Sequence, residues 1–140
     1  MAKNNLEKSE YNKWISDIKL KVHNARTQTA LSVNTSLLEL YWEIGKGIYT
    51  KQKEAKWGSK IIDQIAIDLK HEFPDIKGLS IRNIYAMRQW YLFYSQKFSI
   101  VPQVVAQIPW GHNRLIINKI KDIDEALFYI QETMAGRETF

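Results

Sequence analysis

Apolar side chains recur at helical spacing along most of this chain, and this periodicity limits its fold more than any other feature. They return three and four positions apart over residues 11–48 and 59–95, which is the period of one helix face. The first run places on one face Tyr11, Trp14, Ile15, Ile18, Val22 and Ala25. The second run places on one face Val33, Leu37, Leu40, Tyr41, Ile44 and Ile48. We therefore predict an all-α fold of about six helices, with a disordered tail at residues 1–10 and a single domain at 11–136.

Serine and proline residues mark where the third and fourth helices begin and end. Ser59 is a candidate cap of the third helix, whose inward side would be formed by Ile61, Ile62, Ile65 and Leu69. Pro74 ends that helix because proline disfavours the helical conformation in the residue before it. After the turn "PDIKG", Ser80 is the candidate cap of a fourth helix, which we expect from Ile81 to about Ser95.

The last third of the chain is less regular. The stretch "SIVPQVVAQIPW" contains β-branched residues and two prolines, which favour an extended segment, a short strand or a wing near residues 100–108. A fifth helix is expected over about 112–121, and a sixth from Asp122 or Asp124 to Met134.

Two glycines lie inside the second helical run. Gly45 and Gly47 each cost about 1 kcal/mol of helix stability compared with alanine. They therefore mark either a close helix crossing or a fraying helix end.

The chain offers few of the groups from which catalytic and metal sites are built. It has no cysteine, and its three histidines, His23, His71 and His112, lack the spacing of a helical metal site. Pro74-Asp75 could open a PD-(D/E)XK nuclease motif, but no acidic-x-Lys triplet follows it. We expect no metal, no cofactor and no catalytic residue in this chain. Without a signal peptide or a transmembrane run, a cytoplasmic location is expected.

Acidic residues are absent from a long internal segment. From Ile76 to Lys121 the chain has seven Lys or Arg residues and no Asp or Glu, although its net charge is only +5. A surface of one sign attracts phosphate groups. The alternative is that a fairly apolar segment has few charges and that these happen to be basic.

The third and fourth helices, joined by a short turn, have the outline of a helix-turn-helix. A helical projection of the fourth helix places outward Arg82, Asn83, Ala86, Gln89, Trp90 and Phe93, and inward Ile81, Ile84, Met87, Tyr91, Leu92 and Ser95. The side chains of Arg82, Asn83 and Gln89 are of types that contact base edges. Trp90 and Phe93 would either pack on another element or form a stacking or partner surface, and packing is favoured. Arg88 falls on the inward side, where Glu39, Glu43 or helix-end carbonyls could pair with it.

Three stretches of the chain form a recognisable set: "LYWEIGKGI", "KWGSKIIDQIAIDLKHEFPDIKGLSIRNIYAMRQWY" and "VVAQIPWGHNRLIINKIKDIDEALFYIQET". They resemble the N-terminal domain of the YhcG-like family of bacterial proteins, formerly a domain of unknown function. The resemblance implies a helical, DNA-binding domain that is followed, in full-length members, by a PD-(D/E)XK nuclease domain. It also implies structural positions at Trp57, Gly58, Gly78, Ser80, Arg88, Trp110, His112 and Asn113. Of these, Gly78 suits a turn with positive φ, Ser80 a helix cap and Trp110 a core anchor.

The chain departs from the family pattern at its C-terminal end. Where the family usually continues through a Gly-Trp-Ser-Arg stretch into the nuclease, this chain has "ETMAGRETF". We therefore expect that the C-terminal nuclease domain is absent, in either an excised domain or a natural short protein.

The sequence favours a non-catalytic nucleic-acid-binding module, most simply for DNA, from a YhcG-like nuclease system. Five cations would contact phosphates: Lys77, Arg82, Arg114, Lys119 and Lys121. Asn83 and Gln89 would face bases. The alternative is a protein-interaction or homodimerisation domain that pairs through the first two helices and through Trp90 and Phe93. An enzyme in its own right is the least favoured interpretation.

Overall fold

The computed structural model describes residues 2–26, 30–54, 57–58 and 60–134, and within these ranges it contains helices, turns and loops but no strand. The all-α prediction is confirmed. The elements in chain order are α1 (Ala2–Arg26), α2 (Ala30–Lys53), α3 (Ile61–Glu72), the 3₁₀ turn η1 (Lys77–Leu79), α4 (Ile81–Ser95), α5 (Gln103–Ala106), α6 (Trp110–Lys119) and α7 (Ile123–Met134). Residues 2–10, expected to be a disordered tail, continue helix α1.

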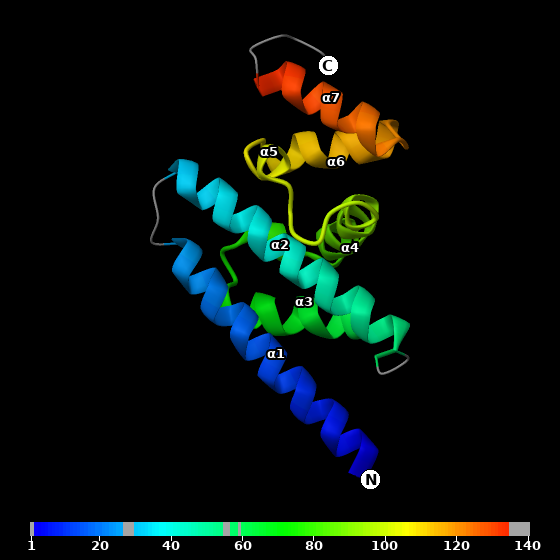
Figure 1. Ribbon diagram of the computed structural model, residues 1–140. Coiled ribbons are helices and arrows are strands. Elements are labelled where there is room, and N and C mark those ends of the chain that lie inside the picture. Colours follow the sequence, from blue (N-terminus) through cyan, green and yellow to red (C-terminus); the bar gives the residue numbers. More distant parts are fainter. Residues whose placement is uncertain (1, 27–29, 55–56, 59, 135–140) are drawn as a thin grey trace.

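Helix α4 lies at the centre of the fold. It packs most extensively on α2, and it also contacts α3, η1 and α6. In Figure 1, α1 and α2 run in opposite directions, with α1 and α3 at one end of the molecule and α5, α6 and α7 at the other. The core therefore surrounds α4, and α2 and α4 together lie between the two ends.

The two glycines of α2 lie at close helix crossings, as one of the two sequence interpretations predicted. A Cβ atom at Gly45 would lie 2.5 Å from the carbonyl oxygen of Met87 on α4. A Cβ atom at Gly47 would lie 2.6 Å from Nε1 of Trp14 on α1. Helix α2 approaches both of its neighbours closely because these positions have no side chain.

The boundaries of α3 and α4 follow the local chemistry of the sequence. Helix α3 ends at Glu72, just before Phe73 and Pro74. The Ser80 hydroxyl accepts a hydrogen bond from the Asn83 N–H at 3.2 Å and caps α4, which has the predicted bounds. The predicted cap Ser59 lies outside the described residues.

Gly78 does not adopt the positive φ that the sequence suggested. It lies within η1, and its φ is outside the left-handed region. A Cβ atom there would instead collide with the hydroxyl of Tyr41 on α2. Glycine is required at this position for space rather than for backbone conformation.

The strand or wing expected near residues 100–108 is wrong, because this stretch contains the short helix α5. Its carbonyl groups accept hydrogen bonds from side-chain amides of α6 and of the distant helix α2 instead of from a partner strand. Asn113 Nδ2 donates to the carbonyls of Val105 at 3.1 Å and Ile108 at 3.3 Å. Asn34 Nδ2 donates to those of Ala106 and Ile108, both at 3.3 Å.

Candidate nucleic-acid interface

The outward face of α4 differs from the predicted one. Its buried side chains are Asn83, Ile84, Met87, Trp90 and Tyr94. Its exposed positions are Ile81, Arg82, Tyr85 and Gln89. The helix is rotated relative to the sequence projection, so that Ile81, predicted to face inward, is 43% exposed and Trp90, predicted to face outward, is 0% exposed.

Aromatic packing explains this rotation. The indole of Trp90 lies edge-on between Trp42 of α2, at a centroid distance of 5.6 Å, and Trp110 of α6, at 5.1 Å. Phe93 is half-buried and packs against the core. The favoured interpretation, that both aromatics pack within the chain, is confirmed. A dimer contact through an exposed Trp90 is therefore wrong.

Asn83 joins three elements at the N-terminal end of α4. Its Nδ2 donates to the Gly78 carbonyl of η1 at 2.6 Å. Its Oδ1 accepts from Trp110 Nε1 at 2.7 Å and from the Arg114 guanidinium of α6 at 3.4 Å. The side chain is 8% exposed. Because both ends of its amide are bonded inside the protein, Asn83 holds α4, η1 and α6 together and does not point towards a ligand.

Tyr41 of α2 completes this cluster. Burial raises the pKa of Tyr41 to about 12, although its hydrogen bond to Asn83 lowers the pKa somewhat. Burial also raises the pKa of Tyr94, and that of Tyr11, which donates to the Asp68 carboxylate at 2.6 Å. These phenols favour the neutral form in the folded protein.

We therefore expect this domain to lose stability at alkaline pH. A phenol whose folded-state pKa is raised contributes its full stability below the unfolded pKa of 10.0, and the contribution falls as pH rises towards the folded value of about 12 for Tyr41. Urea unfolding from about pH 9 to about pH 11.5 should show this fall. The fall should be smaller in the Tyr41→Phe variant. A free energy of unfolding that stays constant over this range would contradict the burial of these hydroxyls.

The structure brings three of the five predicted phosphate-contacting cations to one end of α4. Because Asn83 bonds both Gly78 and Arg114, the sequence neighbours Lys77 and Arg82 lie around the same helix end as Arg114. Lys77 and Arg82 are exposed, and Arg114 is half-buried. The N-terminal end of a helix adds partial positive charge at this place.

The other two cations lie apart from this end. Lys119 and Lys121 are exposed at the C-terminal end of α6, about 7 Å or more along the helix from Arg114. The Lys121 ammonium donates to the Ile117 carbonyl at 3.2 Å. Gln89 is exposed two turns after Arg82 on the outward face of α4.

The predicted partners of Arg88 are wrong. Its guanidinium donates to Gln52 Oε1 near the end of α2, not to Glu39, Glu43 or helix-end carbonyls. It also lies over the ring of Tyr85, 5.9 Å from the centroid. Tyr85, which sequence reasoning missed, sits near the centre of the exposed arc. Its spacing from Ile81, Arg82 and Gln89 would have revealed it once Trp90 was taken as buried.

The remaining motif residues differ in their burial. Trp57 is buried against Tyr11 and Trp14, at centroid distances of 5.9 and 5.4 Å. Asn113 is fully buried, and His112 and Gly58 are exposed. Within the described residues no three His, Cys, Asp or Glu side chains are grouped as metal ligands would be.

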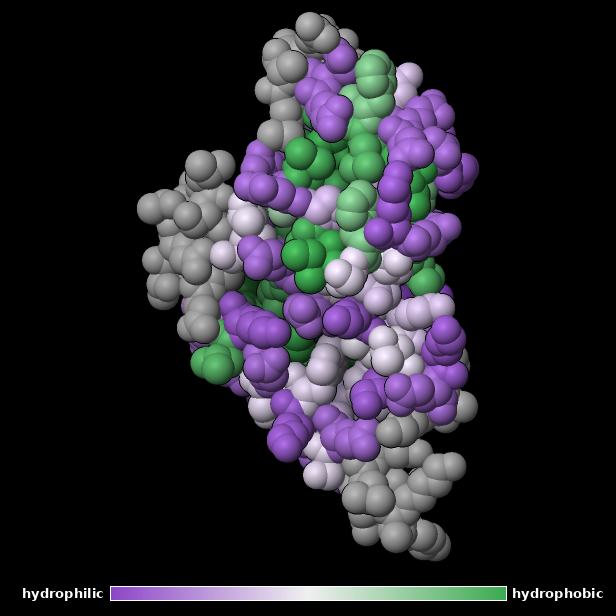
Figure 2. Space-filling view, in the orientation of Figure 1, coloured by the Kyte–Doolittle hydropathy of each residue, from purple (hydrophilic) through white to green (hydrophobic). Residues whose placement is uncertain are grey.

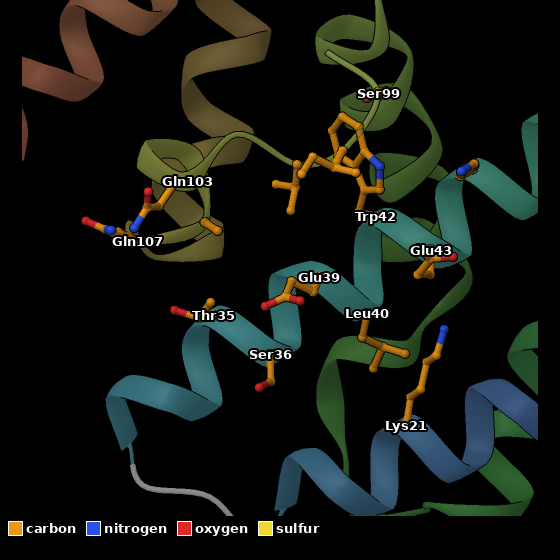
Figure 3. Close-up of a pocket in the computed structure, with 14 residues that line it drawn as sticks. Lys21, Thr35, Ser36, Glu39, Leu40, Trp42, Glu43, Ser99, Gln103 and Gln107 are labelled. Atoms are coloured by element: carbon orange, nitrogen blue, oxygen red, sulfur yellow. The ribbon is translucent and has the colours of Figure 1, made fainter.

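A shallow hollow of about 680 Å³ lies along α2. Figure 3 shows Glu39 and Glu43 on α2, with Gln103 and Gln107 on the segment across from them and Lys21 of α1 on the other side. Two acidic and two basic side chains line the hollow, so it has no net charge and is unlike the end of α4. In the view of Figure 2, apolar side chains show mainly over α5, α6 and α7, and the surface over α1 and α2 is mostly hydrophilic.

Comparison with known proteins identifies the family. Residues 17–139 match the DUF1016 N-terminal domain, and the chain belongs to this family. It is 34% identical over 77 residues to the protein named "Putative nuclease YhcG" of Escherichia coli (strain K12), which confirms the resemblance to YhcG-like proteins. That match covers 52% of this chain and 20% of the relative, so the chain spans a small part of the relative's length. No solved structure matches the chain.

None of the described helices is both long enough and apolar enough to cross a membrane.

Proposed function

We propose that this domain is a non-catalytic nucleic-acid-binding module, acting on DNA, of a YhcG-like nuclease system. The observation that carries the proposal is the cation group at the N-terminal end of α4. There Lys77 and Arg82 neighbour Gly78 and Asn83 in sequence, and Arg114 bonds Asn83. The segment from residue 76 to 121 contains no Asp or Glu. In relatives that continue beyond this domain, the module would hold DNA for the nuclease part.

Arg114 in the middle of α6 and Lys119 at its C-terminal end would contact different phosphates. Lys77 and Arg82 are exposed to solvent. Successive phosphates along one strand of a duplex are separated by several ångströms, so Arg114 and Lys119 could track neighbouring groups. Gln89 is the remaining predicted side chain that would reach base edges, because the amide of Asn83 is occupied inside the protein.

The salt dependence of binding tests the proposal. A labelled duplex titrated with the domain at about 50 and about 200 mM salt should bind more weakly at the higher concentration, because phosphate contacts release counterions. The double variant Arg82→Ala/Lys119→Ala should reduce the slope of log K against log salt by about 2. Fluorescence anisotropy measures both effects.

A matched control keeps the same change in net charge. Lys8 and Lys13 are exposed on α1, which packs on α2 and α3. The variant Lys8→Ala/Lys13→Ala should retain the wild-type slope. Equal losses in both double variants would show an attraction to net charge alone. Failure of the domain to bind either the duplex or its single strand at the lower salt would reject the proposal.

The dimerisation alternative has no comparable support. The exposed large apolar side chains among the described residues are distributed over several elements: Leu20, Ile67, Ile81, Tyr85, Ile100 and Phe128. Among these, Ile81 and Tyr85 are neighbours on one helix face, and that face is the outward face of α4.

A further inference from the structure

The outward face of α4 contains more apolar surface than phosphate binding requires. Tyr85 lies near the centre of its exposed arc and is 43% exposed, and Ile81, one turn before it, is equally exposed. Arg82 and Gln89 flank the tyrosine at three and four positions. An aromatic ring with polar and cationic neighbours on an outward helix face is a surface that fits a partner with both π faces and negative charge.

The ring of Tyr85 has a defined neighbour. The Arg88 guanidinium lies over it, 5.9 Å from its centroid, and is itself held by Gln52 Oε1 of α2. Because α2 and α4 form the largest helix interface of the molecule, this arginine is anchored on the core. The contact limits the rotation of the ring and adds a second positive charge beside Arg82.

The chemistry of this face distinguishes between forms of nucleic acid. A duplex presents base edges in its grooves, where thymine methyl groups are the main apolar target. Unpaired bases present their flat faces, on which aromatic side chains stack, while nearby cations bind the backbone. A central tyrosine between two arginines matches the second case better than the first.

We propose that the outward face of α4 binds single-stranded nucleic acid, with an unpaired base stacked on Tyr85 and the backbone held by Arg82. This inference rests on the proposed nucleic-acid binding and specifies the form that is bound. Gln89 lies on the far side of Tyr85 from Ile81, where it would contact the edge of the stacked base.

Binding of one oligonucleotide as a single strand and as a duplex tests the inference. Tyr85→Ala should weaken single-strand binding about 5- to 100-fold. Tyr85→Leu, which keeps apolar bulk but has no ring, should weaken it to a similar degree, and Tyr85→Phe should keep affinity within about twofold. Binding of the duplex should change much less. A 2-aminopurine base in the strand should lose fluorescence on binding to the wild type and to Tyr85→Phe, but not to Tyr85→Leu.

Phe128→Ala is the matched control, since Phe128 is an exposed aromatic residue on α7. It should leave both affinities unchanged, and thermal unfolding should show that every Tyr85 variant is folded. The domain could instead bind the duplex more tightly than the single strand, in a salt-dependent way that the Tyr85 substitutions do not change. That result would overturn this inference and leave the proposed function standing. Wild-type affinity in Tyr85→Leu would also overturn it, because the contact would then be apolar rather than stacking. Failure to bind either form would reject both proposals.

Discussion

Replacing Trp90 by alanine should lower the free energy of unfolding by about 3–5 kcal/mol. Its side chain is 0% exposed and packs edge-on against Trp42, Trp110 and Tyr94. The indole N–H has no hydrogen-bond partner within the described part of the chain, so the cost comes from lost packing and the cavity that remains. Since domains of this size are stable by roughly 5–15 kcal/mol, urea unfolding followed by circular dichroism should show a large shift.

Phe128→Ala provides the comparison for this experiment. It removes a large aromatic side chain that is 56% exposed, and its effect should stay within about 0.5 kcal/mol. The dimer interpretation predicted that Trp90→Ala would separate two folded subunits. If the Trp90 variant kept wild-type stability and changed only its sedimentation, Trp90 would have to be at the surface, contrary to the packing around α4.

Local signals were sufficient to predict the boundaries of the central helices. Pro74 restricts the residue before it, and Ser80 can accept a hydrogen bond from the third residue after it, whatever the rest of the fold does. The end of α3 and the start of α4 followed from these two residues. The glycines of α2 were also informative, because a helix retains such unfavourable residues where another element needs the space.

The face that α4 presents could not be derived in the same way. Aromatic residues lie around most of its circumference: Tyr85, Trp90, Tyr91, Phe93 and Tyr94. Two different arcs of such a helix look apolar, and the contacts with α2 and α6 decide which is buried. The error changed the candidate site, since it placed Asn83 at the edge of the outward face and concealed Tyr85.

The irregular stretch before α6 shows a second limit of local reasoning. Its β-branched residues favour a strand, but its backbone partners are the amides of Asn34 and Asn113, distant in sequence from some of the carbonyls they bind. These tertiary hydrogen bonds outweighed the β-strand propensity of the stretch. The charge pattern, in contrast, was fully visible in the sequence, and the structure added that Lys77, Arg82 and Arg114 lie around the N-terminal end of α4, apart from Lys119 and Lys121.

Replacing Gly45 by alanine should lower the free energy of unfolding by about 1–3 kcal/mol, although alanine favours helix formation. The new methyl group would lie 2.5 Å from the Met87 carbonyl oxygen and 2.9 Å from Cβ of Tyr91. Neither neighbour is the far end of a flexible side chain, so α2 and α4 would have to separate along their whole interface. Urea unfolding measures the loss of stability. A larger solvent exposure of the tryptophans would report the separation of α2 from α4, because Trp42 and Trp90 pack together between these helices.

Gly111→Ala is the control that separates crowding from helix propensity. Gly111 lies in the first turn of α6, and a Cβ atom there would meet nothing within 4 Å. The same substitution should therefore be neutral or stabilising by about 0.5–1 kcal/mol. Opposite signs for the two variants would show that the close approach of α2 to α4 sets the cost. If Gly45→Ala also increased stability, the interface would have room for a methyl group, and the central crossing on which the candidate site rests would need a different geometry.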